Sequence, residues 1–281
     1  MEETSAEQQP AEQQPEQPQS AAADSRHAAA AASIARSNNR GPSDIRPIRF
    51  LNDIAPHAAG STLIEWGATR VICGATVEEG VPRWMREQGL SGGWITAEYA
   101  MLPYSTQQRK PREASRGRQE GRSQEIQRLI GRSMRAAADL EKLGQRTIWI
   151  DADVLQADGG TRTAAITGGF VALALAIRKL LAAGILSENP IRCQIAAVSV
   201  GIVQGQVRLD LNYEEDVAAE VDMNVVMNSR REFIEIQGTA ERRAFTERQL
   251  SEMLAAARTG LDRLFQLQRE ALGWTAPPTA A

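Results

Sequence analysis

The stretch 156–169, QADGGTRTAAITGG, constrains the fold most, because it joins a strand pattern to a helix pattern through two adjacent glycines. Before it, residues 146–156 alternate apolar and polar side chains, which is typical of a strand. After it, the apolar run FVALALAIRKLL predicts a helix that ends near Leu181. Two explanations of this glycine corner (residues 158–162) remain open. Glycine and threonine favour turns and helix caps, and the free N–H groups and dipole of a helix N-terminus suit an anion.

The rest of the chain mixes further strand and helix patterns. Apolar residues recur at helical spacing over about 123–142, and Gly144 follows as a stop signal. Thr246 to Gln249 fits a capping box for a last helix that ends near Leu272. Expected strands cover about 61–79, 92–102, 146–156, 191–213 with a turn at Gln204-Gly205, 221–228 and 233–238. The order lacks the strict alternation of a parallel dinucleotide-binding sheet, so the sequence predicts an α+β fold.

Composition divides the chain into three parts. Residues 1–38 are rich in Glu, Gln, Pro, Ser and Ala, and we expect them to be disordered. Residues 39–273 form the predicted folded domain, and residues 274–281 a flexible C-terminal tail. No apolar run reaches the roughly 18 residues of a membrane span, and no secretory signal precedes the domain. Cys73 and Cys193 lie in strand-like runs without a C-x-x-C motif, so we expect reduced thiols and a cytoplasmic protein.

Charge is distributed unevenly along a chain whose net charge is −3. Residues 1–20 hold five glutamates and no lysine or arginine, which leaves the remaining residues at +2. The segment 109–122 holds six basic and two acidic residues, a local charge of +4. Such a segment suits a phosphate-rich partner, although a solvated loop explains the charge equally well.

Two arginine-bearing helix starts suggest a site for phosphate. Arg122 stands at the expected start of one helix, and Gly160, Thr161 and Arg162 stand at the start of another. Backbone N–H donors, a hydroxyl group and guanidinium forks together are what an oxyanion needs. The sequence contains neither the G-x-x-x-x-G-K-[ST] motif of nucleoside-triphosphate hydrolases nor a nicotinamide fingerprint.

An acidic cluster follows the expected strands of 191–213. We interpret Glu214, Glu215 and Glu220 as solvated surface residues, whereas Asp210 and Asp222 are each enclosed by apolar neighbours. On one straight strand, the carboxylates of positions 216 and 222 would lie about 20 Å apart. One magnesium ion, with ligands near 2.1 Å, could not join them. They can meet only if the chain turns within DVAAE (216–220).

Five segments together resemble the bacterial ribonuclease PH family. They are GWITAEYAMLP, GRSQEIQRLIGRSMRA, QRTIWIDADVLQADGGTRTAAITG, LDLNYEED and EVDMNVVM, and the likeness covers about residues 40–272. It implies a ribosomal-protein-S5-domain-2-like α+β fold and a homo-hexameric ring built as a trimer of dimers. It also implies a phosphate-dependent 3′→5′ exoribonuclease, a tRNA nucleotidyltransferase. Such an enzyme trims tRNA precursors and other structured RNA 3′ ends and releases nucleoside diphosphates.

The resemblance also implies roles for single residues. Phosphate would bind Arg122 and the triplet Gly160, Thr161 and Arg162. Asp216 and Asp222 would be catalytic and would hold Mg²⁺ or Mn²⁺. In one role, the ion stabilises charge on the transferring phosphate or on the leaving 3′ oxygen. In the other role, an aspartic acid protonates that oxygen. Arg109 and Arg112 would serve RNA binding and ring assembly. Tyr104 departs from the family pattern, which often has a basic residue at this position, and this puts the RNA path in doubt.

Two alternative functions compete with this interpretation. A catalytically silent RNA-binding ring subunit of the same fold would tend to lose the phosphate arginines or the aspartates, but this chain keeps all of them. A metal-dependent hydrolytic nuclease would need no phosphate site and would release nucleoside monophosphates instead of diphosphates.

Overall fold

The computed structural model describes residues 36, 39–113, 115, 117–276 and 278. The predicted tail 1–38 lies outside the described residues except for Arg36, as do 277 and 279–281 of the predicted C-terminal tail. Trp274, the first residue of that second tail, packs edge-to-face on Phe170 with ring centroids 6.1 Å apart. The strands are β1 (Ile48–Asn52), β2 (Gly60–Trp66), β3 (Thr69–Glu79), β4 (Trp94–Met101), β5 (Arg146–Gln156), β6 (Ile195–Val203), β7 (Gln206–Leu209), β8 (Val221–Asn228) and β9 (Phe233–Ala240). The helices are α2 (Arg83–Glu87), α3 (Gly121–Ala137), α4 (Thr161–Ala182), α5 (Tyr213–Ala218) and α6 (Glu247–Leu272), with a short 3-10 helix at Glu141–Leu143.

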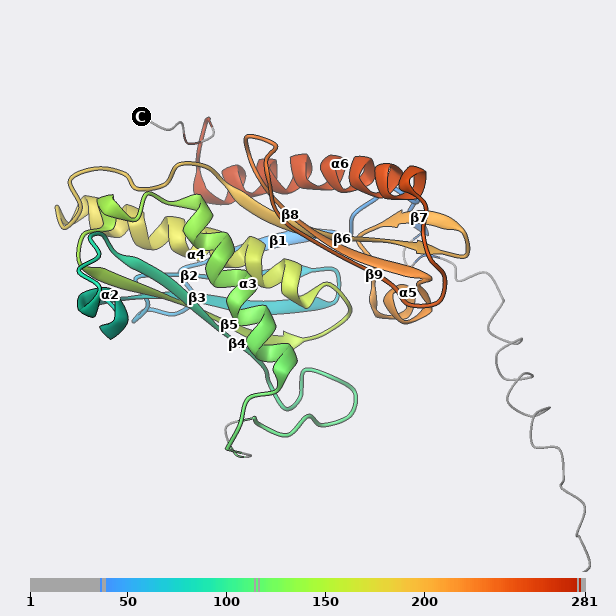
Figure 1. Ribbon diagram of the computed structural model, residues 1–281, viewed down its shortest axis with the longest axis horizontal. Helices are drawn as coiled ribbons and strands as arrows, with labels where there is room; N and C mark the ends of the chain where they lie inside the picture. Colours follow the sequence, from blue (N-terminus) through green and yellow to red (C-terminus); the bar gives the residue numbers. More distant parts are fainter. Residues whose placement is uncertain (1–35, 37–38, 114, 116, 277, 279–281) are drawn as a thin grey trace, which may run out of the picture. The chain divides into compact units, whose positions relative to one another are not determined.

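Two sheets organise these elements, as Figure 1 shows. The first has the order β1-β2-β3-β5-β4, and only β4 and β5 run parallel, because α3 carries the chain back between them. The second has the order β7-β6-β8-β9 and is antiparallel throughout. Gln204 and Gly205, which join β6 to β7, both have positive φ, as a tight hairpin turn requires. The predicted α+β class is confirmed.

Helix α4 occupies the centre of the core. It packs against β2, β3 and β5 of the first sheet and against β6 of the second. Judged by length and mean hydropathy alone, α4 could cross a membrane, contrary to our expectation that no segment is long enough. However, 83% of its most apolar window is buried inside the protein, which is typical of the core helix of a folded domain. Helix α4 is therefore held between the two sheets.

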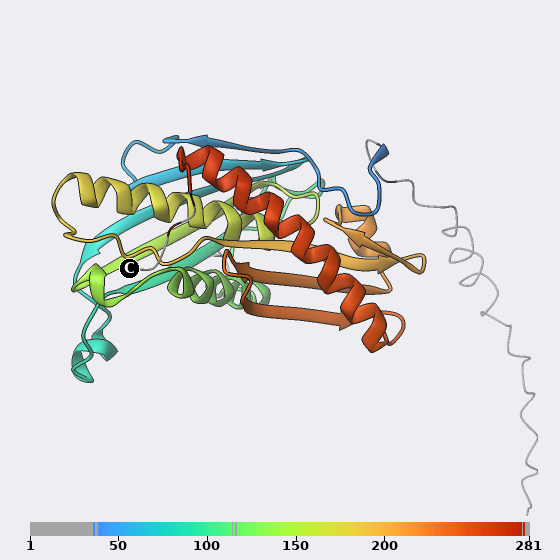
Figure 2. The same ribbon diagram turned by 90° about the horizontal axis from the view of Figure 1, so that it is seen from above.

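The other long helices cover the sheets. Helix α3 packs on β4 and α4, and α6 lies along the second sheet, where it contacts β6 and β7 (Figure 2). The predicted capping box is present at the start of α6, between Thr246 and Gln249. Helix α3 begins at Gly121, two residues earlier than expected, and ends at Ala137 instead of near 142. It ends early because Ala138 adopts an extended conformation and bridges Ile191.

Close packing of β2 on α4 gives a first testable prediction. A Cβ at Gly60 would lie 2.5 Å from the backbone nitrogen of Ala176 and closer still to the carbonyl oxygen of Ala172, whereas a Cβ at Gly74 would meet nothing within 4 Å. Backbone atoms of α4 cannot move aside easily. We expect Gly60→Ala to lower the free energy of unfolding by about 1–3 kcal/mol, and Gly74→Ala to change it by less than about 0.5 kcal/mol.

Urea unfolding at one fixed protein concentration measures both variants, and the slope of each transition checks that the same surface is exposed. Equal midpoints for the two alanine variants would contradict the close approach of β2 to α4.

Candidate active site

The glycine corner turns the chain sharply between β5 and α4. Gly159 and Gly160 both have left-handed backbones, with φ of +75° and +68°, which glycine adopts at little cost. Gly160 is the N-cap of α4, and no side chain caps the helix there. The first turn of α4 also contains no acidic residue. The backbone N–H groups and the positive end of the helix dipole therefore remain available to an anion.

Two side chains of the first turn of α4 are fixed by residues of β4, β9 and α3. The Arg162 guanidinium donates to the side-chain oxygen of Gln237 at 2.7 Å and to the carboxylate of Glu125 at 3.3 Å. The Thr161 hydroxyl oxygen accepts a hydrogen bond of 2.9 Å from the hydroxyl of Tyr99, a buried residue of β4. Because Thr161 accepts through its oxygen, its own proton is free to be donated to a ligand.

Arg122 belongs to the same site although it comes from another helix. It lies in the first turn of α3, one residue inside the helix instead of just ahead of it. Burial raises the pKa of the Tyr99 hydroxyl, and the positive charges of Arg122 and Arg162 oppose this rise. Both arginines therefore lie within electrostatic range of the glycine corner.

Asp216 and Asp222 lie close enough to influence each other electrostatically. Asp216 lies in α5 and Asp222 on β8, and the chain reverses between them. Asp216 is exposed as a residue, but partial desolvation of its carboxyl raises the pKa, the charge of Asp222 raises it further, and Arg122 and Arg162 act in the opposite direction. The two carboxylates and the two arginines thus form one electrostatic cluster.

The aspartate pair has the character of a cation site. Asp222 Oδ1 is buried and has no hydrogen-bond partner among the described residues. A buried carboxylate oxygen without a partner, next to a second carboxylate, is what a hard divalent cation neutralises. The described residues contain no group of three or more His, Cys, Asp or Glu side chains that could hold a metal. Two carboxylates leave the remaining positions to water and phosphate oxygens, as Mg²⁺ commonly prefers.

One sequence interpretation is wrong at Glu215. We expected a solvated side chain, but Glu215 is fully buried and pairs with Arg36, Arg40 and Arg208. Glu214 is exposed, as expected, and Glu220 is half-buried and accepts a hydrogen bond from the backbone of Gly205. Arg36 and Arg40 lie far from Glu215 in sequence, and Arg208 lies on β7 whereas Glu215 lies in α5, so no local pattern could reveal these partners.

The basic loop lies to one side of the corner. Arg109 and Arg112 are exposed. Burial raises the pKa of the Asp153 carboxyl on β5, and the charge of Arg112 opposes that rise, so Arg112 lies near this strand. Tyr104 is 67% exposed. Within the described part of the chain, no hydrogen bond or ion pair connects Arg109 or Arg112 to the glycine corner.

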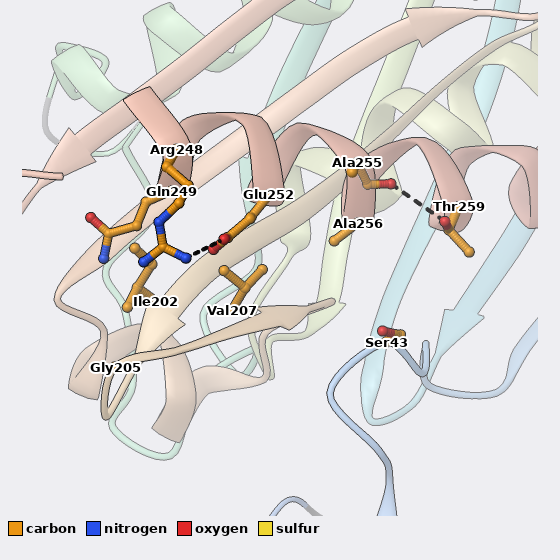
Figure 3. A pocket seen from close by; sticks show the side chains of 10 residues that line it. All are labelled: Ser43, Ile202, Gly205, Val207, Arg248, Gln249, Glu252, Ala255, Ala256 and Thr259. Atoms are coloured by element: carbon orange, nitrogen blue, oxygen red, sulfur yellow. Dashed lines mark hydrogen bonds and ion pairs between the residues drawn. The ribbon is translucent and has the colours of Figure 1, made fainter. Parts of the chain in front are cut away.

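A hollow lies elsewhere, and none of the predicted site residues lines it. It has a volume of about 560 Å³ and lies between α6 and the β6–β7 hairpin, with Ser43 at one end (Figure 3). Arg248 and Glu252, which line it, form an ion pair of 2.8 Å with each other. Since this pair satisfies both charges, the hollow has less to offer an anion than the glycine corner does.

Four residues of the site were not predicted from the sequence. Tyr99, Glu125 and Gln237 orient the first turn of α4, and Arg46 contacts the corner from an N-terminal segment. Tyr99 and Glu125 lie inside the segments that carried the family resemblance, and this was their only signal. Gln237 and Arg46 reach the site through the fold alone.

Comparisons with family models and with known proteins match most of the chain. Models of the 3′ exoribonuclease family match the chain, domain 1 over residues 44–179 and domain 2 over residues 193–260. Ribonuclease PH of Bacillus cereus strain AH187 is 54% identical over 239 residues, which cover 85% of this chain and 97% of that protein.

Solved structures share the fold at lower sequence identity. Rice (Oryza sativa) Rrp46 gives a TM-score of 0.68 at 18% identity, covering 85% of this chain and all of the rice chain. A chain of the Archaeoglobus fulgidus exosome with RNA bound to the active site gives a TM-score of 0.69 at 21% identity, covering 85% of this chain and 93% of the archaeal one. From the family models, the ribonuclease PH relatives and the shared fold, we conclude that the chain belongs to the 3′ exoribonuclease family.

Proposed function

We propose that this protein is a phosphorolytic 3′→5′ exoribonuclease that trims the 3′ ends of tRNA precursors and other structured RNAs. The activity follows from its family and its ribonuclease PH relatives. The proposal for the site rests on one observation, which is that the charges of Asp222, Arg122 and Arg162 all act on the Asp216 carboxyl. In the reaction, an oxygen of inorganic phosphate attacks the last phosphodiester. The bond from phosphorus to the preceding 3′ oxygen breaks, that oxygen takes up a proton, and a nucleoside diphosphate leaves.

We assign phosphate binding to the glycine corner and the arginines beside it. The N–H groups of the first turn of α4, the Thr161 hydroxyl, and the guanidinium groups of Arg162 and Arg122 supply donors from two helices. The positive charges of the two guanidinium groups offset the repulsion between an anionic nucleophile and an anionic RNA backbone. Holding phosphate in line with the scissile bond provides much of the rate enhancement in such transfers.

Asp216 and Asp222 are the proposed catalytic groups. They would hold a Mg²⁺ or Mn²⁺ ion, which supplies charge stabilisation at the transferring phosphate or at the leaving oxygen. The raised pKa of Asp216 also suits a carboxylic acid that gives the leaving 3′ oxygen its proton. A metal titration distinguishes the two roles, because only the first requires the ion.

The remaining assignments follow the family resemblance. We propose that Arg109 and Arg112 contact RNA beyond the catalytic centre, that the protein assembles as a homo-hexameric trimer of dimers, and that it acts in the cytoplasm. Both arginines are exposed and carry part of the +4 charge of segment 109–122, which supports their contact with a phosphate backbone. A catalytically silent RNA-binding subunit is not favoured, because the phosphate arginines Arg122 and Arg162 and the two aspartates of the site are all present.

Product identity tests the reaction class. A 3′-extended tRNA incubated with the protein should release nucleoside diphosphates only when inorganic phosphate is present. Chromatography against nucleoside mono- and diphosphate standards identifies the product. Monophosphates formed without phosphate would establish a hydrolytic nuclease instead and would overturn the proposed function.

Substitution of the arginines tests the phosphate site. Arg162→Ala and Arg122→Ala should each raise the KM for phosphate about ten- to a hundredfold, because a hydrogen bond to a charged group contributes about 1.5–3 kcal/mol. Affinity for tRNA should change far less. Arg248→Ala serves as the matched control, since Arg248 lines the separate hollow of Figure 3. An unchanged dependence of rate on phosphate in both site variants would remove these arginines from the phosphate site.

Asparagine substitution tests the aspartates. Asp216→Asn and Asp222→Asn should each lower single-turnover phosphorolysis by at least about 10²-fold, the scale for losing one key electrostatic group. Without metal, Asp216→Asn should make the fold slightly more stable near neutral pH. A raised pKa means that the folded state holds the proton more tightly than the unfolded state, so the ionised carboxylate of the wild type costs stability there.

This stability difference should shrink as the pH falls and Asp216 becomes protonated in the wild type. Urea unfolding in chelator at several pH values measures it. Wild-type turnover by the two asparagine variants, or full wild-type activity in excess chelator, would contradict the assignment of a metal to this pair.

A further inference from the structure

The glycine corner and the start of α5 are in direct backbone contact. A Cβ at Gly159 would lie 2.6 Å from the carbonyl carbon of Asn212 and 2.7 Å from the carbonyl oxygen of Leu211. The backbone N–H of Tyr213 also faces Asp158 Oδ1 at 3.4 Å. The segment that offers donors to phosphate and the helix that carries Asp216 are therefore positioned against each other, without an intervening side chain.

Arg46 joins both sides of this contact. The Arg46 side chain is 3% exposed. The Asp210 carboxylate accepts three hydrogen bonds from Arg46: from its backbone N–H at 2.6 Å, from Nε at 3.0 Å and from a terminal guanidinium nitrogen at 2.7 Å. The guanidinium also donates to the carbonyl oxygens of Asp158 and Gly159 in the corner and of Leu211 before α5. One planar group thus holds the end of β5 and the segment that follows β7.

The backbone around Asp210 supports the same conclusion. Asp210 is 1% exposed and has a φ of +55°, in the left-handed region that non-glycine residues seldom adopt. Its N–H donates to the carbonyl oxygen of Ser199 at 2.7 Å, and the Ser199 hydroxyl accepts from the N–H of Leu211 at 3.0 Å. A left-handed backbone at a non-glycine residue costs free energy, so it persists only where the surrounding structure holds it in place.

Two further arginines of the N-terminal segment hold α5 itself. Glu215, the residue before Asp216, is fully buried and accepts from Arg36 Nε at 2.7 Å and from Arg40 at 3.3 Å. Arg36 also donates to the backbone carbonyl of Asp210 at 3.0 Å. Helix α5 has only six residues, too few to be stable by itself, so its orientation depends on contacts of this kind.

We propose that Arg36, Arg40 and Arg46, which we call the arginine strap, are positioning residues for phosphorolysis. Through Asp210 and Glu215 they fix where Asp216 stands relative to the phosphate bound at the glycine corner. This inference rests on the function proposed above and adds residues other than the proposed phosphate donors and the aspartate pair.

A purely stabilising role explains the strap less well. Replacing a buried ion pair by well-packed apolar residues is often neutral or stabilising, so such pairs are weak sources of folding energy. What the strap supplies is a fixed geometry, because guanidinium forks bind carboxylates and carbonyl groups in defined directions. The strap acts at the junction of the two segments whose separation decides whether phosphate and carboxylates meet.

Full-length Arg46→Lys and Arg36→Gln test the strap. Lysine keeps the charge of Arg46 but cannot reach Asp210 and the three carbonyl groups together. Arg36→Gln removes one of three arginines that pair with Glu215 and leaves Arg40 and Arg208 beside that carboxylate. We expect kcat at saturating phosphate and RNA to fall about ten- to a hundredfold, because small displacements of catalytic groups carry costs of that size. The Kd for tRNA should stay within about twofold of wild type.

Amide hydrogen exchange supplies the second readout. Residues 158–160 and 213–218 should exchange faster in both variants, while the exchange of α6 stays unchanged. Arg49→Gln is the matched control, because it removes an arginine that pairs with Glu65 on the exposed side of β1 and β2. It should leave kcat and the exchange of both segments at wild-type values.

The outcomes separate this inference from the proposed function. Wild-type kcat in both folded variants would overturn the role of the strap and leave the proposed function standing. A loss of activity fully explained by a smaller folded fraction, with normal kcat per folded molecule, would overturn it too. If the wild type itself released no diphosphates in phosphate, the proposed function would fall, and the role of the strap with it.

Discussion

The structure depends on one constraint, which is that α4 has to be covered along nearly its whole length. Most of its residues are apolar and fully buried, so the helix is stable only between two layers that exclude water from it. The first sheet and β6 of the second sheet provide those layers. Gly60 lets the backbone of β2 come close to that of α4, and Gly168 leaves room for the side chains of Ile64 and Cys73. The helix can therefore emerge to solvent only at its ends, and its N-terminal end becomes the proposed phosphate site.

Much of the fold was predictable because its signals are local. The alternation over β5, the hairpin at Gln204-Gly205 and the capping box at Thr246 each depend on residues that are neighbours in the chain. Distance gave the turn between Asp216 and Asp222 only as a condition, because no ion could join them along one extended strand. The end of α3 was placed wrongly, since Ala138 leaves the helix to pair with Ile191, more than fifty residues away.

The site was predictable only in part, for a physical reason. Gly160, Thr161, Arg162 and the two aspartates stand in short motifs, whereas the groups that hold them come from distant segments. Arg46 and Asp210 are 164 positions apart, and Arg36 and Glu215 are 179 apart. Glu215 looked like a solvated acid because four of its neighbours in sequence are polar or charged. Only the fold brings buried arginines to it and changes that interpretation.

The shared helix also determines how the chain holds together as a folding unit. The two family models divide the sequence near residues 179–193, which suggests two modules. Yet a single hydrophobic core contains Ile64 and Val71 of the first sheet together with Val198 and Val225 of the second, with α4 between them. A chain cut between the modules would leave one face of α4 or one face of the second sheet exposed to water. The two modules therefore share one hydrophobic core, and each needs the other to bury its apolar surface.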